Sequence, residues 1–119
     1  FPLFGDDYDT FDGSCIRDYI HVEDLAIAHL QALNKVIENN KSDSFNLGKG
    51  KGYSNLEVID AIKRVGGVDI QIEKKPRRPG DPSTIYADNS KARQILGFDP
   101  KYSDLETIIK TAWTWHSKK

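Results

Sequence analysis

The chain has 119 residues, which is enough for one domain with a modest hydrophobic core. Its 17 basic and 18 acidic side chains give a formal net charge of −1, so no overall field favours nucleic acid or a membrane surface as a partner. No segment is long and apolar enough to span a bilayer. The single cysteine, Cys15, excludes an internal disulfide, argues against a metal site and favours the cytoplasm as the compartment.

Strand-like and helix-like patterns alternate along the first half of the chain. Residues 1–4 are apolar with a proline near their start, which is typical of an edge strand. After an aspartate-rich loop, residues 17–22 form a short ordered run, and residues 23–38 carry apolar side chains at helical spacing. Residues 44–48 predict a short strand that leads into a glycine-rich turn. This alternation predicts a small mixed α/β fold.

The middle of the chain carries clear signals for a helix, a strand and a stiff loop. Ser54 and Glu57 have the spacing of a capping box and predict the start of a helix, which the glycines at 66–67 end. Residues 68–74 alternate apolar with polar side chains, as a half-buried strand does. Residues 76–82 hold three of the five prolines, so this stretch should be a non-helical loop.

Two more helices are expected near the end of the chain. Residues 85–87 extend briefly, and a short helix then starts at Ser90 or one residue earlier and closes at Gly97. Ser103 and Glu106 repeat the capping-box spacing and predict the start of a last, amphipathic helix.

The glycine-rich segment 48–52 is the first candidate site. It follows a predicted strand and precedes a predicted helix, which is the context of a dinucleotide-binding loop. However, the third glycine is not at the required offset, and no acidic residue ends a second strand about twenty residues later. We therefore interpret the segment as a tight structural turn, and its two lysines leave contact with a phosphate as the alternative.

The second candidate site is the basic run that starts at Lys74. Four of the five residues 74–78 are cationic, and such a run is most often a solvated surface. Nucleic acid is the next alternative, but the run has no interleaved aromatic residues on which bases could stack. The prolines stiffen the loop and bring Arg77 and Arg78 near the carboxylate of Asp81. An arginine fork beside a carboxylate suits a ligand with a diphosphate and sugar hydroxyls.

The third candidate is Arg17, which lies where the aspartate-rich loop gives way to the ordered run. A binding residue at such a point is held on a rigid element and not on a loop tip. The alternative for Arg17 is an ion pair with Asp18 or Asp24, and the alternative for Tyr19 is a half-buried strand aromatic. His21 has no cysteine or serine partner nearby in the sequence, so we expect it to be structural and not an acid–base residue.

Several segments together resemble the epimerase branch of the extended short-chain dehydrogenase/reductase superfamily, specifically the UDP-galactose (UDP-glucose) 4-epimerases. The resemblance covers nearly the whole chain. The segments that carry it are Phe4-Gly5-Asp6-Asp7-Tyr8-Asp9-Thr10, Asp12-Gly13, Arg17-Asp18-Tyr19-Ile20-His21-Val22-Glu23-Asp24-Leu25-Ala26, Asn46-Leu47-Gly48, Arg77-Arg78-Pro79-Gly80-Asp81 and Trp113-Thr114-Trp115.

The resemblance implies a substrate-binding role for one group of residues. Pro2, Leu3 and Phe4 would supply backbone contacts and a stacking face to uracil. Tyr19 would line the same nucleotide pocket, and Asp81 would accept hydrogen bonds from the ribose hydroxyls.

By the same resemblance, Arg17 and Arg78 would hold the diphosphate from opposite sides, and Arg77 would face solvent or pair with a nearby carboxylate. Ile85 would help to bound the sugar. Because Ile85 is smaller than the aromatic residue often found before the position of Tyr86, we hypothesise that the sugar pocket admits an N-acetylated hexose.

The resemblance also implies an activity, which is the NAD-dependent, reversible inversion at C4 of UDP-glucose and UDP-galactose. The 119 residues contain neither a Gly-X-X-Gly-X-X-Gly loop nor a Tyr-X-X-X-Lys pair. Residues 1–119 are therefore expected to be the C-terminal substrate-binding domain of a longer chain, without its N-terminal Rossmann domain. NAD would belong to the full-length enzyme, and the fragment alone should bind no cofactor and be inactive.

Two alternatives stay open at this stage. The first is a fragment of a related nucleotide-sugar dehydratase, decarboxylase or epimerase. The second is a non-catalytic domain that associates with itself as a homo-oligomer, because removal of a partner domain would expose apolar surface.

Overall fold

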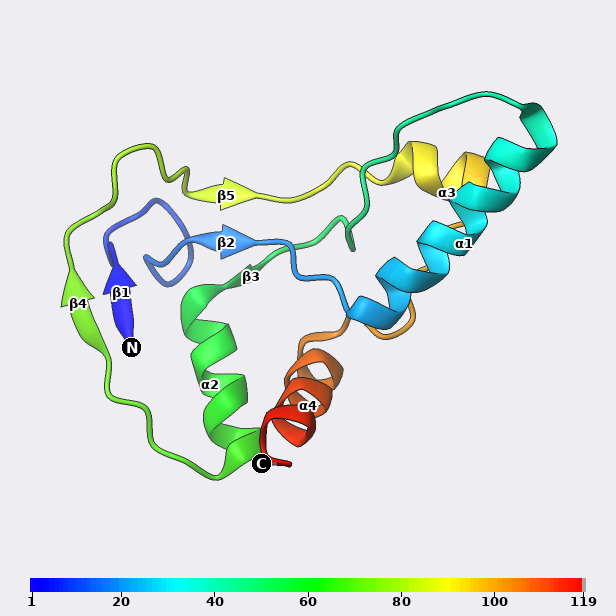
Figure 1. Ribbon diagram of the computed structural model, residues 1–119. Helices are drawn as coiled ribbons and strands as arrows, with labels where there is room; N and C mark the ends of the chain where they lie inside the picture. The colour runs from blue at the N-terminus through cyan, green and yellow to red at the C-terminus, as the bar shows by residue number, and fades with distance from the viewer. Residues whose placement is uncertain (119) are drawn as a thin grey trace.

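The computed structural model describes residues 1–118 as a flattened molecule with extents of 50 × 36 × 20 Å. Its radius of gyration is 16.9 Å, whereas a compact domain of this length would have about 13.5 Å. Figure 1 shows why: the strands gather on one side, a pair of helices lies at the opposite end, and a second helix pair lies below them at the bottom of the view. The fold is the small mixed α/β arrangement expected from the sequence.

Five short strands form two sheets. In the first sheet, β1 (Pro2–Phe4) runs parallel to β4 (Glu73–Lys75). In the second, β2 (Ile16–Arg17) lies between an antiparallel partner, β3 (Tyr53–Ser54), and a parallel partner, β5 (Thr84–Ile85). Arg17 is thus held on the central strand of its sheet.

The edge strand predicted over residues 1–4 is confirmed as β1, but two other strand predictions are wrong. The structure has no strand at residues 44–48, because no neighbouring strand among residues 1–118 pairs with this segment. Of the strand predicted over 68–74, only the end is present, as part of β4. Its partner β1 pairs with residues 73–75, and within residues 1–118 no strand pairs with residues 68–72.

Four helices lie close to their predicted positions. They are α1 (Val22–Asn39), α2 (Asn55–Gly66), α3 (Ser90–Leu96) and α4 (Leu105–His116). Gly97 ends α3 with a φ of 68°, a left-handed conformation that glycine adopts without strain, as its place in the sequence predicted.

The capping-box prediction is right for α2 and wrong for α4. Ser54 and Glu57 exchange side-chain and backbone hydrogen bonds at the start of α2. At α4, Asp104 is the N-cap and accepts from the backbone N–H of Thr107 at 2.9 Å. Ser103 cannot serve there, since its buried hydroxyl donates to Asp24 at 2.5 Å.

A small hydrophobic core cluster lies between α1 and α3. Its buried members are Ala28, Ala92, Leu96 and Phe98. Other hydrophobic residues are buried outside this cluster, namely Leu3, Tyr8, Cys15, Ile59 and Ala61. The apolar stripe of α1 is only partly covered, since Leu30 is 65 % exposed and Ile37 is 71 % exposed. Helix α1 therefore presents apolar side chains, among them Leu30 and Ile37, that residues 1–118 leave mostly uncovered.

Helix α2 packs against α4 at a point of close approach. A Cβ atom on Gly66 would lie 2.6 Å from the indole of Trp113, so only glycine permits this contact without a shift of the ring. No helix within residues 1–118 has both the length and the apolar character needed to cross a membrane.

Candidate functional site

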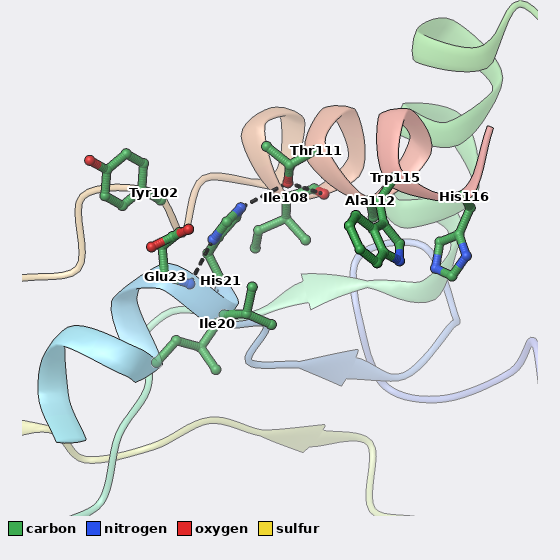
Figure 2. Close-up of a pocket in the computed structure, with 10 residues that line it drawn as sticks. Ile20, His21, Glu23, Tyr102, Ile108, Thr111, Ala112, Trp115 and His116 are labelled. Carbon is green, nitrogen blue, oxygen red and sulfur yellow. Dashed lines mark hydrogen bonds between the residues drawn. The ribbon is translucent and has the colours of Figure 1, made fainter. Parts of the chain in front are cut away.

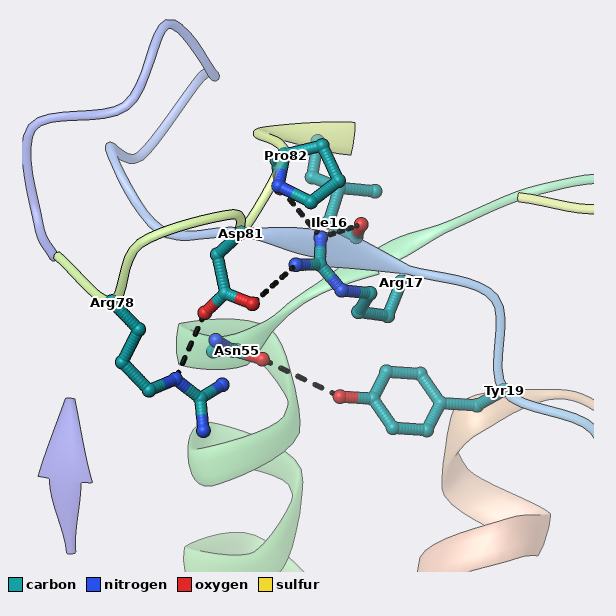
Figure 3. Close-up of polar contacts among 7 residues, drawn as sticks. All are labelled: Ile16, Arg17, Tyr19, Asn55, Arg78, Asp81 and Pro82. Carbon is teal, nitrogen blue, oxygen red and sulfur yellow. Dashed lines mark hydrogen bonds and ion pairs between the residues drawn. The ribbon is translucent and has the colours of Figure 1, made fainter. Parts of the chain in front are cut away.

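A polar cavity of about 400 Å³ lies between β1, β2, the start of α2 and the loop that precedes β5. It is lined by Phe1, Pro2, Phe4, Cys15, Arg17, Tyr19, Asn55, Arg78 and Asp81. The cavity thus brings together most of the residues that the sequence singled out for substrate binding. Figure 3 shows the polar side chains that meet there.

Asp81 lies between the two arginines. Its Oδ2 is 2.9 Å from Nε of Arg78, and its Oδ1 is 3.9 Å from Nη2 of Arg17 (Figure 3). Arg17 also donates through Nη1 to the carbonyl oxygens of Ile16 at 2.8 Å and Pro82 at 3.0 Å. Two guanidinium groups around one carboxylate leave a local charge of +1, which suits an anionic ligand.

Arg17 forms no ion pair with Asp18 or Asp24, so that alternative is wrong. The carboxylate of Asp18 instead accepts from three backbone N–H groups, those of Lys49 at 2.9 Å, Gly50 at 3.0 Å and Ala87 at 3.1 Å. It thereby ties together three separate segments of the chain.

The same contacts decide the role of the glycine-rich segment 48–52. Because Asp18 already occupies the N–H groups of Lys49 and Gly50, they cannot hold the phosphates of a dinucleotide. A Cβ on Gly48 would lie 2.5 Å from Oδ2 of Asp18, so the glycine allows a close backbone approach. The segment is a structural turn, as interpreted from the sequence, and its occupied N–H groups do not fit the phosphates of NAD.

The first strand forms one wall of the cavity. The guanidinium carbon of Arg78 lies 4.8 Å from the centroid of the Phe4 ring, a cation–π contact. Pro2 also faces the cavity, whereas the side chain of Leu3 is buried on the other face of β1. Leu3 could therefore contact a ligand only through its backbone.

Tyr19 and Asn55 form the opposite wall. The hydroxyl of Tyr19 donates to Oδ1 of Asn55 at 3.4 Å (Figure 3). Partial burial raises the pKa of Tyr19, although the nearby charge of Arg17 acts in the opposite direction. The sequence reading missed Asn55. Its place directly after the capping residue Ser54 puts it in the first turn of α2, where helix N–H groups attract polar ligands, and this signal could have found it.

Two predicted residues lie elsewhere. Ile85 is on β5, is 51 % exposed and does not line the cavity, so the idea of a roomier sugar pocket stays a prediction. Arg77 pairs with Asp7 at 2.8 Å and stacks on Tyr8, as expected for an arginine with a nearby carboxylate partner.

A larger hollow of about 820 Å³ lies between the start of α1 and α4 (Figure 2). His21 borders it, but this side chain is structural, as expected. Its Nδ1 accepts from the N–H of Glu23 and caps α1, and its Nε2 lies 2.8 Å from the hydroxyl of Thr111. The hollow contains none of the predicted binding residues, and no arginine or lysine of residues 1–118 lines it. The polar cavity is therefore the better candidate for an anionic ligand.

Comparisons with known proteins identify the family of this chain. The family model described as GDP-mannose 4,6 dehydratase matches residues 5–111. The UDP-glucose 4-epimerase of Lactobacillus helveticus is 53% identical over 116 residues, which are 98% of this chain and 35% of the relative.

Solved structures have the same fold. The UDP-Glc/GlcNAc 4-epimerase from Campylobacter jejuni has a TM-score of 0.88 and 50% identity, over 100% of this chain and 36% of that chain. The UDP-glucose 4-epimerase from Bifidobacterium longum, in complex with NAD+ and UDP, has a TM-score of 0.85 and 42% identity, over 99% of this chain and 35% of that chain. The chain spans about a third of the length of the curated relatives it matches. It belongs to the extended short-chain dehydrogenase/reductase family of nucleotide-sugar enzymes, which includes the UDP-glucose 4-epimerases.

Proposed function

We propose that this chain is the UDP-sugar-binding, C-terminal portion of a UDP-glucose 4-epimerase of galactose metabolism. The observation that carries the proposal is the polar cavity in which Arg17 and Arg78 flank Asp81, with the aromatic ring of Phe4 on its wall. The similarity to a UDP-glucose 4-epimerase over 98% of this chain supports it.

The arginines would bind the diphosphate. A ligand with two negative charges must lose its hydration shell on entering the cavity, and charge-assisted hydrogen bonds from two guanidinium groups offset that cost. Arg17 is fixed on β2 by two carbonyl oxygens, whereas the side chain of Arg78 is 60 % exposed and can turn towards a ligand. Asp81 would then accept from ribose hydroxyls through the oxygen that Arg78 releases.

The remaining lining residues would hold the nucleoside. Phe4 offers a flat apolar surface against which uracil can stack, and the backbone of Pro2 and Leu3 borders the same place. Tyr19 and Asn55 provide polar groups on the opposite wall. With both ends of the UDP held in this way, the hexose would remain free to turn.

The chemical step would depend on the rest of the enzyme. NAD, bound in a Rossmann domain of the full-length protein, would take hydride from C4 of the hexose and return it to the other face. This chain supplies neither a dinucleotide loop nor a Tyr-X-X-X-Lys pair, so we expect it to be inactive alone.

Two features support packing against a further domain. Helix α1 leaves Leu30 and Ile37 exposed, and no strand within residues 1–118 pairs with residues 44–48. A missing sheet could pair with that segment and cover that helix. The relatives are nearly three times as long as this chain, which leaves room for such a domain.

Two alternatives make different predictions. Self-association through α1 would give a homo-oligomer whose mass rises with concentration in native mass measurements. A related dehydratase is favoured by the description of the family model, but the identity of about 50% to several 4-epimerases favours the epimerase. We place the protein in the cytoplasm, in keeping with its lone cysteine.

Calorimetric titration of UDP into the chain tests the proposal. Arg78→Ala should raise the Kd about tenfold to a hundredfold, since it removes a charge-assisted contact worth about 1.5–3 kcal/mol. Arg77→Ala is the matched control, because it removes the same charge from the adjacent position but breaks the pair with Asp7 outside the cavity. Equal losses in the two variants, or no UDP binding at all, would contradict the proposal.

A further inference from the structure

The aspartate-rich loop after β1 connects the two walls of the cavity. At one end it is tied to the basic loop, because Arg77 pairs with Asp7 at 2.8 Å and stacks on the ring of Tyr8 at 4.2 Å. At the other end it reaches the start of α2 through Asp12. The basic loop carries the cavity residue Arg78, and the start of α2 carries Asn55.

Asp12 is the centre of a buried cluster at that second end. Its Oδ1 accepts from the backbone N–H of Ser14 at 2.9 Å and from the hydroxyl of Ser14 at 2.8 Å. Its Oδ2 accepts from the hydroxyl of Ser54 in a short hydrogen bond. Both serines are fully buried, so neither hydroxyl can turn to water for a substitute partner.

Each serine hydroxyl then accepts from one N–H group of the first turn of α2. Oγ of Ser14 accepts from Leu56 at 3.3 Å, and Oγ of Ser54 accepts from Glu57 at 3.1 Å. A hydroxyl has one hydrogen, and the ionised carboxylate only accepts. Asp12 therefore draws both hydrogens to itself and leaves the serine lone pairs directed at the helix.

The first turn of α2 is fixed completely by these contacts. The N–H of Asn55 donates to the carbonyl oxygen of Cys15 at 3.0 Å, so the first three N–H groups of the helix all have partners. The segment that supplies two of these partners leads directly into β2 and Arg17. Asn55, Tyr19 and Arg17 are thus set relative to one another by the cluster around Asp12.

We propose that Asp12 is a positioning residue for the UDP site, which acts by orienting the serine hydroxyls that hold the first turn of α2 and, through that turn, the Asn55 side chain. The proposal rests on the proposed function for the identity of the ligand. Asp12 does not line the cavity, and its effect on a ligand is therefore indirect.

The charge state of Asp12 agrees with this role. Burial disfavours the ionised form, but hydrogen bonds from Ser54 and Ser14 outweigh it and hold the pKa of the Asp12 carboxyl below its usual value. The carboxylate is therefore ionised, and able only to accept, at neutral pH.

The substitution Asp12→Asn tests the proposal with little change of shape. The amide nitrogen donates, so one serine must turn its hydrogen away from position 12. That buried hydrogen has lost its acceptor, and the reoriented hydroxyl holds its helix N–H less well. We expect amide hydrogen exchange at Leu56 or Glu57 to rise about tenfold and the Kd for UDP to rise several-fold. Asp9→Asn is the matched control, since it removes the same charge from an exposed position of the same loop.

A double-mutant cycle separates positioning from a general loss of stability. In an Asn55→Ala background, Asp12→Asn should change the Kd for UDP less than twofold, because Asn55 carries the effect. In an Arg78→Ala background the full effect should persist. The proposal would be overturned if Asp12→Asn changed the Kd for UDP equally in both backgrounds. It would also be overturned if the amide hydrogen exchange and UDP affinity of Asp12→Asn were the same as those of Asp9→Asn.

Two further measurements keep the test decisive. If Asp12→Asn does not fold, Ser14→Ala, which removes only one hydroxyl, should give a smaller effect in the same direction, and no effect would overturn the proposal. If the unmodified chain binds no UDP, the proposed function fails by itself. The role of Asp12 is then tested by the nuclear Overhauser effect between the Tyr19 ring and the side-chain amide of Asn55. Asp12→Asn should abolish this signal, and an unchanged signal would overturn the proposal.

Discussion

Replacing Asp24 by alanine should destabilise this chain strongly. The carboxylate is 2 % exposed and accepts from the backbone N–H groups of Lys101 and Tyr102, each at 2.9 Å, and from the hydroxyl of Ser103 at 2.5 Å. The same hydroxyl accepts from the N–H of His21. Asp24 therefore joins the start of α1 to the loop that leads into α4.

The size of the effect follows from the groups that would be left without partners. A hydrogen bond to a charged group contributes about 1.5–3 kcal/mol, and a buried donor left unpaired costs about 1–3 kcal/mol. Because water can reach part of the vacated space, we expect Asp24→Ala to lower the free energy of unfolding by about 3–5 kcal/mol. Asp24→Asn keeps one acceptor oxygen and should cost about half as much.

Urea unfolding followed by tryptophan fluorescence measures this loss, since both tryptophans, Trp113 and Trp115, lie on α4. Glu23→Ala is the control, because Glu23 is the exposed neighbour on the same turn of α1 and its loss should cost less than about 1 kcal/mol. If Asp24→Ala costs no more than Glu23→Ala, the three hydrogen bonds do not stabilise the fold as described.

Three further predictions can be measured in the same way. Asp104→Ala removes the N-cap of α4 and should lower the free energy of unfolding by about 1 kcal/mol; an unchanged urea midpoint would contradict this. Gly48→Ala places a Cβ 2.5 Å from the carboxylate of Asp18 and should cost about 1–3 kcal/mol, measured by thermal unfolding; a more stable variant would refute the close approach. The pKa of the Asp12 carboxyl is lowered from 3.8 in the folded chain. The ionised carboxylate therefore makes its full contribution to the free energy of unfolding above that pH, and this contribution is lost as the pH falls through the lower folded-state pKa. The difference in free energy of unfolding between the unmodified chain and Asp12→Asn should therefore become smaller as the pH falls. A difference that grows on acidification would contradict the lowered pKa of Asp12.

Local signals in the sequence predicted the helices well because the groups that start and end them are neighbours in the chain. The capping box of Ser54 and the left-handed Gly97 are examples. Predictions failed where a distant residue decides the structure. Ser103 does not cap α4, because its hydroxyl donates a hydrogen bond to Asp24, which is 79 residues away in the sequence. Residues 44–48 have the composition of a strand but no partner strand in residues 1–118.

In the candidate site, too, some features could be predicted from the sequence and others depend on how distant segments pack. The resemblance to a known family found Arg17, Arg78 and Asp81, which the structure brings together in one cavity. It did not find Asn55, because this residue lies outside the motifs that carry the resemblance, and only the capping signal at Ser54 marks it as part of the first turn of α2. Nor could it show that Asp81 joins the two arginines, because that geometry depends on how the basic loop packs beside β2.

The most direct test of the central claim is to map UDP binding on the chain by heteronuclear NMR. We expect UDP to shift the signals of residues that line the polar cavity and to leave those of the turn at 48–52 unchanged. The cavity residues to follow are Phe4, Arg17, Tyr19, Asn55, Arg78 and Asp81. Shifts confined to Lys49 and Lys51, or no shifts at high UDP concentration, would contradict the claim that this chain carries the nucleotide site.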